Sequence, residues 1–188
     1  FRICDKGCGI RVFDLKQEVE YDFSTKIHMV KKIIAVSGGF DPIHIGHVRM
    51  IQEAAALGDE LVVIVNNDHW LMKKKGFVFM PQEQRKEIIE ALSGVSRVYI
   101  TQHEQECTDM SVCEALKEIQ PQVFANGGDR FADNIPEAVL ARELGIELVF
   151  NIGQGGKVQS SSWLAAKDRQ SRECFCGSGR NYSECHGI

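Results

Sequence analysis

The segment Ser37-Gly38-Gly39-Phe40-Asp41-Pro42-Ile43-His44-Ile45-Gly46-His47 decides how the rest of this chain is interpreted. The apolar run 33–36 before it is typical of a short buried strand, and apolar residues at helical spacing follow it. The segment is therefore predicted to join a strand to a helix through a glycine turn. Because the first turn of a helix has backbone N–H groups without intrahelical partners and a partial positive charge, this junction suits a phosphate group.

Two glycines and two histidines suggest the chemistry of the junction. Gly38 and Gly39 allow the backbone to approach a ligand closely. His44 and His47 are three residues apart, so both imidazoles can face one side of the turn and donate to the same phosphate. A Gly-Gly turn or a single histidine is common in ordinary structure, and only their combination favours a phosphate site.

The whole segment resembles the Gly-x-Phe-Asp-x-x-His-x-Gly-His signature of the cytidylyltransferase-like nucleotidyltransferase superfamily, and every fixed position matches. That superfamily includes glycerol-3-phosphate cytidylyltransferase, heptose-1-phosphate adenylyltransferase and archaeal FAD synthetase. The resemblance covers roughly residues 30–168. It implies a Rossmann-like enzyme in which a phosphate oxygen of the acceptor attacks the α-phosphorus of a nucleoside triphosphate, and pyrophosphate leaves. Mg²⁺ would neutralise the triphosphate, and Asp41 would hold the local geometry or a metal-bound water.

Length and composition fit one domain with a small appendage. The chain has 188 residues, of which 44% are hydrophobic and 26% charged. Its net charge of -4 argues against a general nucleic-acid-binding surface. No apolar run approaches the roughly 20 residues that span a membrane, and the start lacks a secretory pattern. We therefore expect a cytoplasmic enzyme.

Strand and helix patterns alternate after residue 29. Strands are predicted at 32–37, 61–65, 97–100, 121–126 and 147–150, and helices at about 46–57 and from Pro81, Ser111 and Asn134 onward. Ser111 and Glu114 resemble a capping box, and the stretch from 66 to 80 is predicted to be a polar loop. The alternation predicts an α/β fold with a doubly wound, parallel five-stranded sheet. We divide the chain into an extension of unknown role (1–28), a nucleotidyltransferase domain (29–168) and a tail (169–188).

Ligands of such sheets bind beyond the carboxyl ends of the strands, where several polar loops are predicted to meet. We assign catalytic roles to four residues: His44, His47, Asp41 and Lys73. Nucleotide binding is assigned to Gly38, Gly39, Phe40, Gly46, Gly128, Asp129, Ser160, Ser161 and Ser162. Substrate binding is assigned to Asn66, Lys75 and Arg85, the last because Pro-x-x-x-Arg recurs at this place in the family.

Two loops bear on the choice of nucleotide. Gly127-Gly128-Asp129 resembles heptose-1-phosphate adenylyltransferases and favours ATP, whereas glycerol-3-phosphate cytidylyltransferases usually carry Gly-Asp-Asp there. CTP with a polyol phosphate is the alternative. The serine run resembles the second signature of the family, but Gln159 replaces its isoleucine and Ala165 its last basic residue. Lys157 and Lys167 are the nearby cations that can compensate.

The tail carries a separate metal motif. Its spacing of Cys174, Cys176, Cys185 and His186 resembles the SEC-C motif, Cys-x-Cys-x₈-Cys-(His/Cys). Three thiols and one imidazole form a known tetrahedral zinc set, and an odd total of seven cysteines disfavours a disulfide framework. We predict structural Zn²⁺ in the tail, which would dock a protein partner, contact nucleic acid or close the C-terminus.

Two other interpretations are weighed against the enzyme. The string His44-Ile45-Gly46-His47 also occurs in class I aminoacyl-tRNA synthetases, but the chain has no Lys-Met-Ser-Lys-Ser run and no room for a tRNA-binding domain. A degenerate nucleotide-binding adaptor acting through the zinc tail is the second, with Ala165 as its main support. By resemblance alone, a homodimer is expected.

Overall fold

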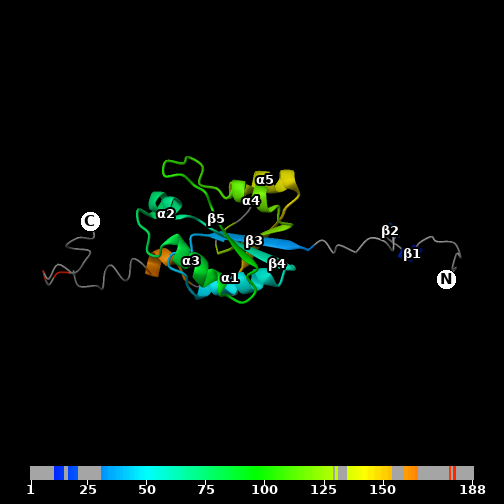
Figure 1. Ribbon diagram of the computed structural model, residues 1–188, viewed down its shortest axis with the longest axis horizontal. Helices are drawn as coiled ribbons and strands as arrows, with labels where there is room; N and C mark the ends of the chain where they lie inside the picture. The colour runs from blue at the N-terminus through cyan, green and yellow to red at the C-terminus, as the bar shows by residue number, and fades with distance from the viewer. Residues whose placement is uncertain are drawn as a thin grey trace. The chain divides into compact units, whose positions relative to one another are not determined.

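The computed structural model describes residues 11–14, 17–20, 31–128, 130, 135–153, 159–164, 178 and 180 (Figure 1). The chain divides into two compact units, 1–30 and 31–188. In the first unit, β1 (Arg11–Asp14) and β2 (Gln17–Glu20) pair as an antiparallel hairpin. The predicted domain boundaries at 28/29 and 168/169 stay predictions.

The second unit is built on a parallel five-stranded sheet, as predicted. Its strands are β3 (Ile33–Gly38), β4 (Glu60–Val65), β5 (Arg97–Ile100), β6 (Val123–Gly127) and β7 (Glu147–Ile152), in the order β5-β4-β3-β6-β7. All neighbouring pairs are parallel. The order reverses at β3, which lies between β4 and β6, and this is the switch point where such sheets bind ligands.

Helices cover both faces of the sheet (Figure 1). They are α1 (Ile45–Ala55), α2 (Asp68–Lys75), α3 (Gln82–Glu90), α4 (Cys113–Ile119) and α5 (Glu137–Leu144). Figure 1 shows α1 and α3 on one face and α4 and α5 on the other. Two apolar cores result: Val36 packs in the core that contains Ile51 and Ile89, and its neighbour Ala35 packs in the core that contains Leu116. This alternation explains why the central strands are apolar throughout.

The prediction of a polar loop at 66–80 was partly wrong, because α2 occupies much of it. Asn67 caps this helix by accepting the backbone N–H of Trp70 at 3.0 Å, and Gly76 ends it with φ of +76°. Only Leu71 is buried on α2, so the helix has almost no apolar stripe in the sequence. Its end caps were the only sequence signal for it.

The start of α4 also differs from its prediction. The N-cap is Val112, whose backbone N–H donates to the buried carboxylate of Glu137 at 3.0 Å. The hydroxyl of Ser111 accepts the backbone N–H of Cys113 at 3.3 Å and not that of Glu114, so no capping box with Glu114 forms. The predicted helix start at Asn134 lies outside the described residues. Among the helices that the structure describes, none is long and apolar enough to span a membrane.

Candidate active site

A cavity of about 320 Å³ opens at the carboxyl ends of β3, β6 and β7. Its walls come from the β3–α1 loop, the first turn of α1, the end of α2 and residues 159–162. Of the predicted site residues, the following line it: Gly38, Gly39, His44, Gly46, His47, Lys75, Gly128, Ser160, Ser161 and Ser162. Segments more than 100 positions apart in the sequence therefore meet at one edge of the sheet, which was the geometric expectation.

The two signature histidines stand together in this cavity. Their ring centroids are 3.7 Å apart and the rings are nearly parallel, inclined by 16°. The backbone N–H of His44 donates to Nδ1 of His47 at 3.3 Å. Nδ1 of His47 is thus an acceptor, so the neutral ring carries its proton on Nε2 and can donate from that atom.

Partial burial disfavours the protonated form of both imidazoles. Desolvation, followed by the nearby charges of His44 and Lys75, lowers the pKa of His47 to about 3. Desolvation also lowers the pKa of His44, with Lys75 acting in the same direction. At neutral pH the pair therefore offers N–H donors without adding positive charge.

Phe40 forms the floor under His47. Its ring is 1% exposed and meets the His47 ring edge to face at a centroid distance of 4.9 Å. Its backbone has φ of +51°, in a region that is strained for an aromatic residue. A Cβ on Gly38 would lie 3.1 Å from two Phe40 ring carbons, so glycine is needed there for the ring to pack. Phe40 does not line the cavity, and its contribution to the predicted nucleotide site is the packing contact with His47.

Asp41 is not placed as a metal or water ligand. Its side chain is fully buried, and its carboxylate accepts the backbone N–H groups of Phe79 at 2.9 Å and Met80 at 2.6 Å. The backbone carbonyl of Asp41 accepts from Nζ of Lys75 at 2.8 Å. Of the two predicted roles for Asp41, the structure fits the one in which it holds local geometry.

The lysines of α2 point in different directions. Lys75 lines the cavity, and desolvation lowers the pKa of its amine although Asp41 opposes this. The amine of Lys73 donates instead to the backbone carbonyl of Cys107, outside the lining. The structure therefore favours Lys75 over Lys73 as the lysine that meets phosphate.

Two residues predicted to bind substrate are enclosed by protein. Arg85 is fully buried, and its guanidinium donates to three backbone carbonyls and to Asp68. Asn66 is 4% exposed and does not line the cavity. Because both side chains are buried and neither lines the cavity, neither is placed to contact a substrate in this arrangement.

The serine run closes the opposite side. Residues 161–164 form a helical turn, and the hydroxyl of Ser161 donates to the backbone carbonyl of Pro42 at 2.9 Å. This bond joins the second signature to the first across 119 positions. A Cβ on Gly127 would meet the Met50 sulfur at 2.8 Å, so glycine at the end of β6 allows the close approach of α1.

Sequence reasoning missed Arg130 and Asn126, which also line the cavity. Their positions at and just after the end of β6 were the available signal, since Arg130 directly follows Gly-Gly-Asp. No lining residue that the structure describes carries a carboxylate, whereas Lys75 and Arg130 supply two cations. This charge balance fits a polyphosphate. Asp129, Cys174, Cys176, Cys185 and His186 lie outside the described residues.

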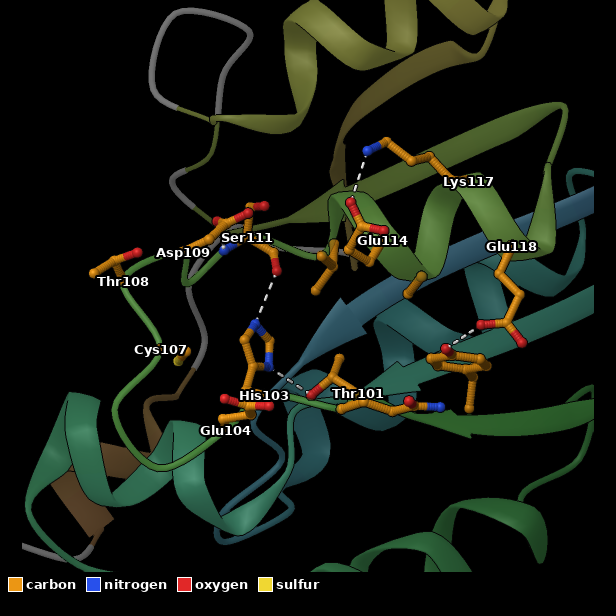
Figure 2. A pocket seen from close by; sticks show the side chains of 14 residues that line it. Thr101, His103, Glu104, Cys107, Thr108, Asp109, Ser111, Glu114, Lys117 and Glu118 are labelled. Carbon is orange, nitrogen blue, oxygen red and sulfur yellow. Dashed lines mark hydrogen bonds and ion pairs between the residues drawn. The ribbon is translucent and has the colours of Figure 1, made fainter.

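A larger cavity, of about 750 Å³, lies between β5, the loop after it and α4 (Figure 2). Figure 2 shows His103 pointing from that loop to Ser111, whose backbone carbonyl is 2.9 Å from Nε2. Glu104, Asp109, Glu114 and Glu118 line this cavity against the single cation Lys117. Its negative charge disfavours a triphosphate, so the smaller cavity is the better nucleotide site despite its size.

Comparison with known families agrees with this geometry. The profile of cytidylyltransferase-like proteins matches residues 35–169, which is more than half of the chain and spans every described wall of the smaller cavity. The chain belongs to the cytidylyltransferase-like family. A second profile, the SEC-C motif, matches residues 173–188.

Relatives within the cytidylyltransferase-like family include archaeal and bacterial proteins. The FAD synthase of Thermococcus kodakarensis is 42% identical over 103 residues, which are 54% of this chain and 66% of that protein. The FAD synthase of Ferroglobus placidus is 39% identical over 55% of this chain and 63% of its own. The bifunctional protein HldE of Pelobacter propionicus is 34% identical over 73% of this chain and 25% of its own. The chain thus spans less than two thirds of each of these relatives.

A solved structure shares the fold. The lipopolysaccharide core biosynthesis protein from Thermoplasma volcanium superposes with a TM-score of 0.52 at 25% identity, and the match covers 65% of this chain and 98% of that one. This supports the Rossmann-like architecture predicted from the alternation of strands and helices.

Proposed function

We propose that this chain transfers a nucleoside monophosphate from a nucleoside triphosphate to a phosphorylated sugar or polyol and releases pyrophosphate. The observation that carries the proposal is the stacked pair His44 and His47 beside Lys75 in a cavity whose described lining has no carboxylate. Such a lining attracts phosphate charge and positions it without a covalent enzyme intermediate.

The acceptor's phosphate oxygen forms a bond to the α-phosphorus while the bond from that phosphorus to the β-phosphate oxygen breaks. The electron pair leaves with pyrophosphate. His47 donates from Nε2 to a phosphate oxygen, because its Nδ1 already accepts the backbone N–H of His44. Lys75 and Arg130 stabilise the charge that develops on the phosphates.

The serines and glycines of the walls provide hydroxyls and open space for the phosphate chain. Gly128 has φ of +74°, and no atom of the described residues lies within 4 Å of a Cβ built on it, so the described part of the chain leaves this backbone open to a ligand. Among the described residues, no group of three or more acidic, histidine or cysteine side chains is arranged to hold a metal ion. Mg²⁺ as the ion that accompanies the triphosphate therefore stays a prediction.

ATP is the favoured nucleotide. The Gly127-Gly128-Asp129 resemblance supports it, and so does the likeness to FAD synthases, because FAD contains an adenylate group. CTP with glycerol 3-phosphate is the alternative. The same likeness makes FMN a second candidate acceptor, since its ribityl phosphate is itself a polyol phosphate.

The test is pyrophosphate release by the purified full-length chain. Each of the four nucleoside triphosphates is paired with glycerol 3-phosphate, hexose and heptose 1-phosphates and FMN, with and without Mg²⁺. Release above the acceptor-free rate for one pair, with the matching nucleotide-linked product found by mass spectrometry, supports transfer. Nucleotide binding without release for any pair would instead support the degenerate adaptor.

The remaining features of the proposal rest on resemblance. We propose a cytoplasmic location, and we propose a homodimer by resemblance to the superfamily. The SEC-C segment, residues 173–188, is proposed to hold structural Zn²⁺ through three cysteines and one histidine and to contact a protein partner.

A further inference from the structure

The side chain of Arg85 occupies an unusual place for a cation. It is fully buried on α3, and four of its hydrogen bonds are defined. Nε donates to the carbonyl of Met80 at 2.9 Å, and Nη1 donates to the carbonyls of Gly39 at 2.6 Å and Asn66 at 2.7 Å. Nη2 donates to the carboxylate of Asp68 at 2.5 Å. Because burying a charge is unfavourable unless it is paired, these contacts need to form together.

Three of the four partners of Arg85 lie in the signature loop or at the start of α2, which carry the side chains proposed to bind phosphate. Gly39 directly precedes Phe40, whose ring supports His47. Asn66 and Asp68 flank Asn67, the N-cap of α2, and Lys75 is the last residue of that helix. One guanidinium thus holds the signature loop and the start of α2 at a defined separation.

The far end of α2 returns to the same loop. Lys75 donates to the carbonyl of Asp41, and the Asp41 carboxylate accepts the N–H of Met80, whose own carbonyl accepts from Arg85. The contacts therefore form a closed ring from Arg85 through α2 to the signature loop and back. A change at Arg85 alters both ends of α2 at once.

We propose that Arg85 is a positioning residue of the nucleotidyl-transfer site: it sets the distance between the His44–His47 pair and Lys75 without touching nucleotide or acceptor. This inference rests on the proposed function. An arginine can donate to these four acceptors at once because the N–H groups of its guanidinium lie in one rigid plane. A lysine ammonium lacks this geometry. A direct role in substrate binding would instead require the guanidinium to face the cavity.

The test compares Arg85→Lys with the wild type and with Lys86→Ala. Lys86 is the next residue on α3, and among the described residues its amine pairs with Glu90 alone, at 3.9 Å, so it controls for the loss of a cation on this helix. We expect Arg85→Lys to lower kcat about 10²-fold, as a misplacement of about 1 Å does, while the KM values for both substrates change much less. Lys86→Ala keeps wild-type values.

A double-mutant cycle with Lys75→Ala separates positioning from stability. If Arg85 acts by placing Lys75, the double variant Arg85→Lys/Lys75→Ala loses much less activity than the product of the two single losses. Fully multiplicative losses would overturn the proposal, and so would a loss confined to the KM of the acceptor. Asp68→Ala provides a milder variant if Arg85→Lys does not fold, because the Asp68 side chain is 33% exposed. We expect Asp68→Ala to lower kcat as well, by less than Arg85→Lys does.

An activity-free measurement distinguishes failure of this inference from failure of the proposed function. In NMR spectra of the ligand-free chain, the ring signals of His47 shift in Arg85→Lys and stay at their wild-type positions in Lys86→Ala. Unchanged His47 signals in Arg85→Lys overturn positioning, whether or not the wild type releases pyrophosphate. A wild type that releases no pyrophosphate overturns the proposed function, and the His47 signals then still decide whether Arg85 positions the side chains of the cavity.

Discussion

The imidazole rings of His44 and His47 stack at 3.7 Å, one at the N-cap of α1 and the other in its first turn. Two imidazolium ions at this separation would repel each other, and desolvation already lowers the pKa of both rings. The charged form of both rings is therefore disfavoured, and Lys75 and Arg130 are the cationic side chains of the cavity. The two imidazoles thus supply hydrogen-bond donors, whereas Lys75 and Arg130 supply the positive charge.

Removing either imidazole should reduce turnover. We expect His44→Ala and His47→Ala each to lower kcat about 10²–10³-fold, the usual loss for one transition-state donor. Steady-state pyrophosphate release measures this, and circular dichroism checks that the fold is retained. His69→Ala is a matched control, because His69 is exposed on α2 and does not line the cavity. Unchanged turnover of His47→Ala would contradict the proposed mechanism.

The half-buried His47 should make stability depend on pH. Its folded-state pKa of about 3 lies below the ordinary value of 6.5, so the unfolded chain binds an extra proton between these pH values. The free energy of unfolding therefore falls as the pH drops below 6.5, by about 2 kcal/mol between pH 6.5 and 4.5 from this group. Urea unfolding of wild type and His47→Asn at both pH values measures the difference. An equal loss in both proteins would show that His47 does not carry this dependence.

Lys75 should matter more than the other lysines of α2. We expect Lys75→Ala to weaken binding of the nucleoside triphosphate about tenfold or more, because it removes a half-buried cation from the phosphate cavity. Isothermal titration with the ligand-free protein measures this. Lys74→Ala, at an exposed position between the two candidates, controls for net charge. Lys73→Ala should weaken nucleotide binding less than Lys75→Ala does. A larger loss of affinity in Lys73→Ala would instead support the sequence-based assignment of Lys73.

The SEC-C segment should bind one zinc ion per chain. Elemental analysis of the purified protein measures the zinc content per chain. Cys176→Ser is expected to abolish zinc binding, because it removes one of the four ligands of the tetrahedral site. Cys113→Ser is the control, because Cys113 is a free cysteine on α4 outside the motif. Zinc retained in Cys176→Ser, or lost in Cys113→Ser, would contradict the ligand assignment.

The regular elements were predictable where burial leaves a periodic pattern. The strand at 61–65 is apolar throughout because helices cover both faces of the sheet, and it appears as β4 at Glu60–Val65. Helix α2 was missed because one buried residue, Leu71, leaves no period to detect. Its stability depends on its caps and on contacts with residues distant in the sequence.

The candidate site was predictable in outline but not in the role of each side chain. The signature located His44 and His47 and the loops that meet them, because parallel strands bring their carboxyl ends to one edge. Arg85 shows the limit of this reasoning: its sequence position does not reveal that Gly39, Asn66 and Asp68 surround it. Likewise, the sequence around Lys73 and Lys75 does not show which of the two side chains faces the cavity.

By itself, the sequence determined the family, the five strands of the sheet and most of its helices, and it predicted a glycine turn whose backbone N–H groups suit phosphate. Those properties depend on residues that are neighbours along the chain. Only the tertiary structure decided which cations face the cavity and which are enclosed by protein carbonyls. Side-chain direction and burial depend on segments that folding brings together, and these set both the pKa of His47 and the surroundings of Arg85.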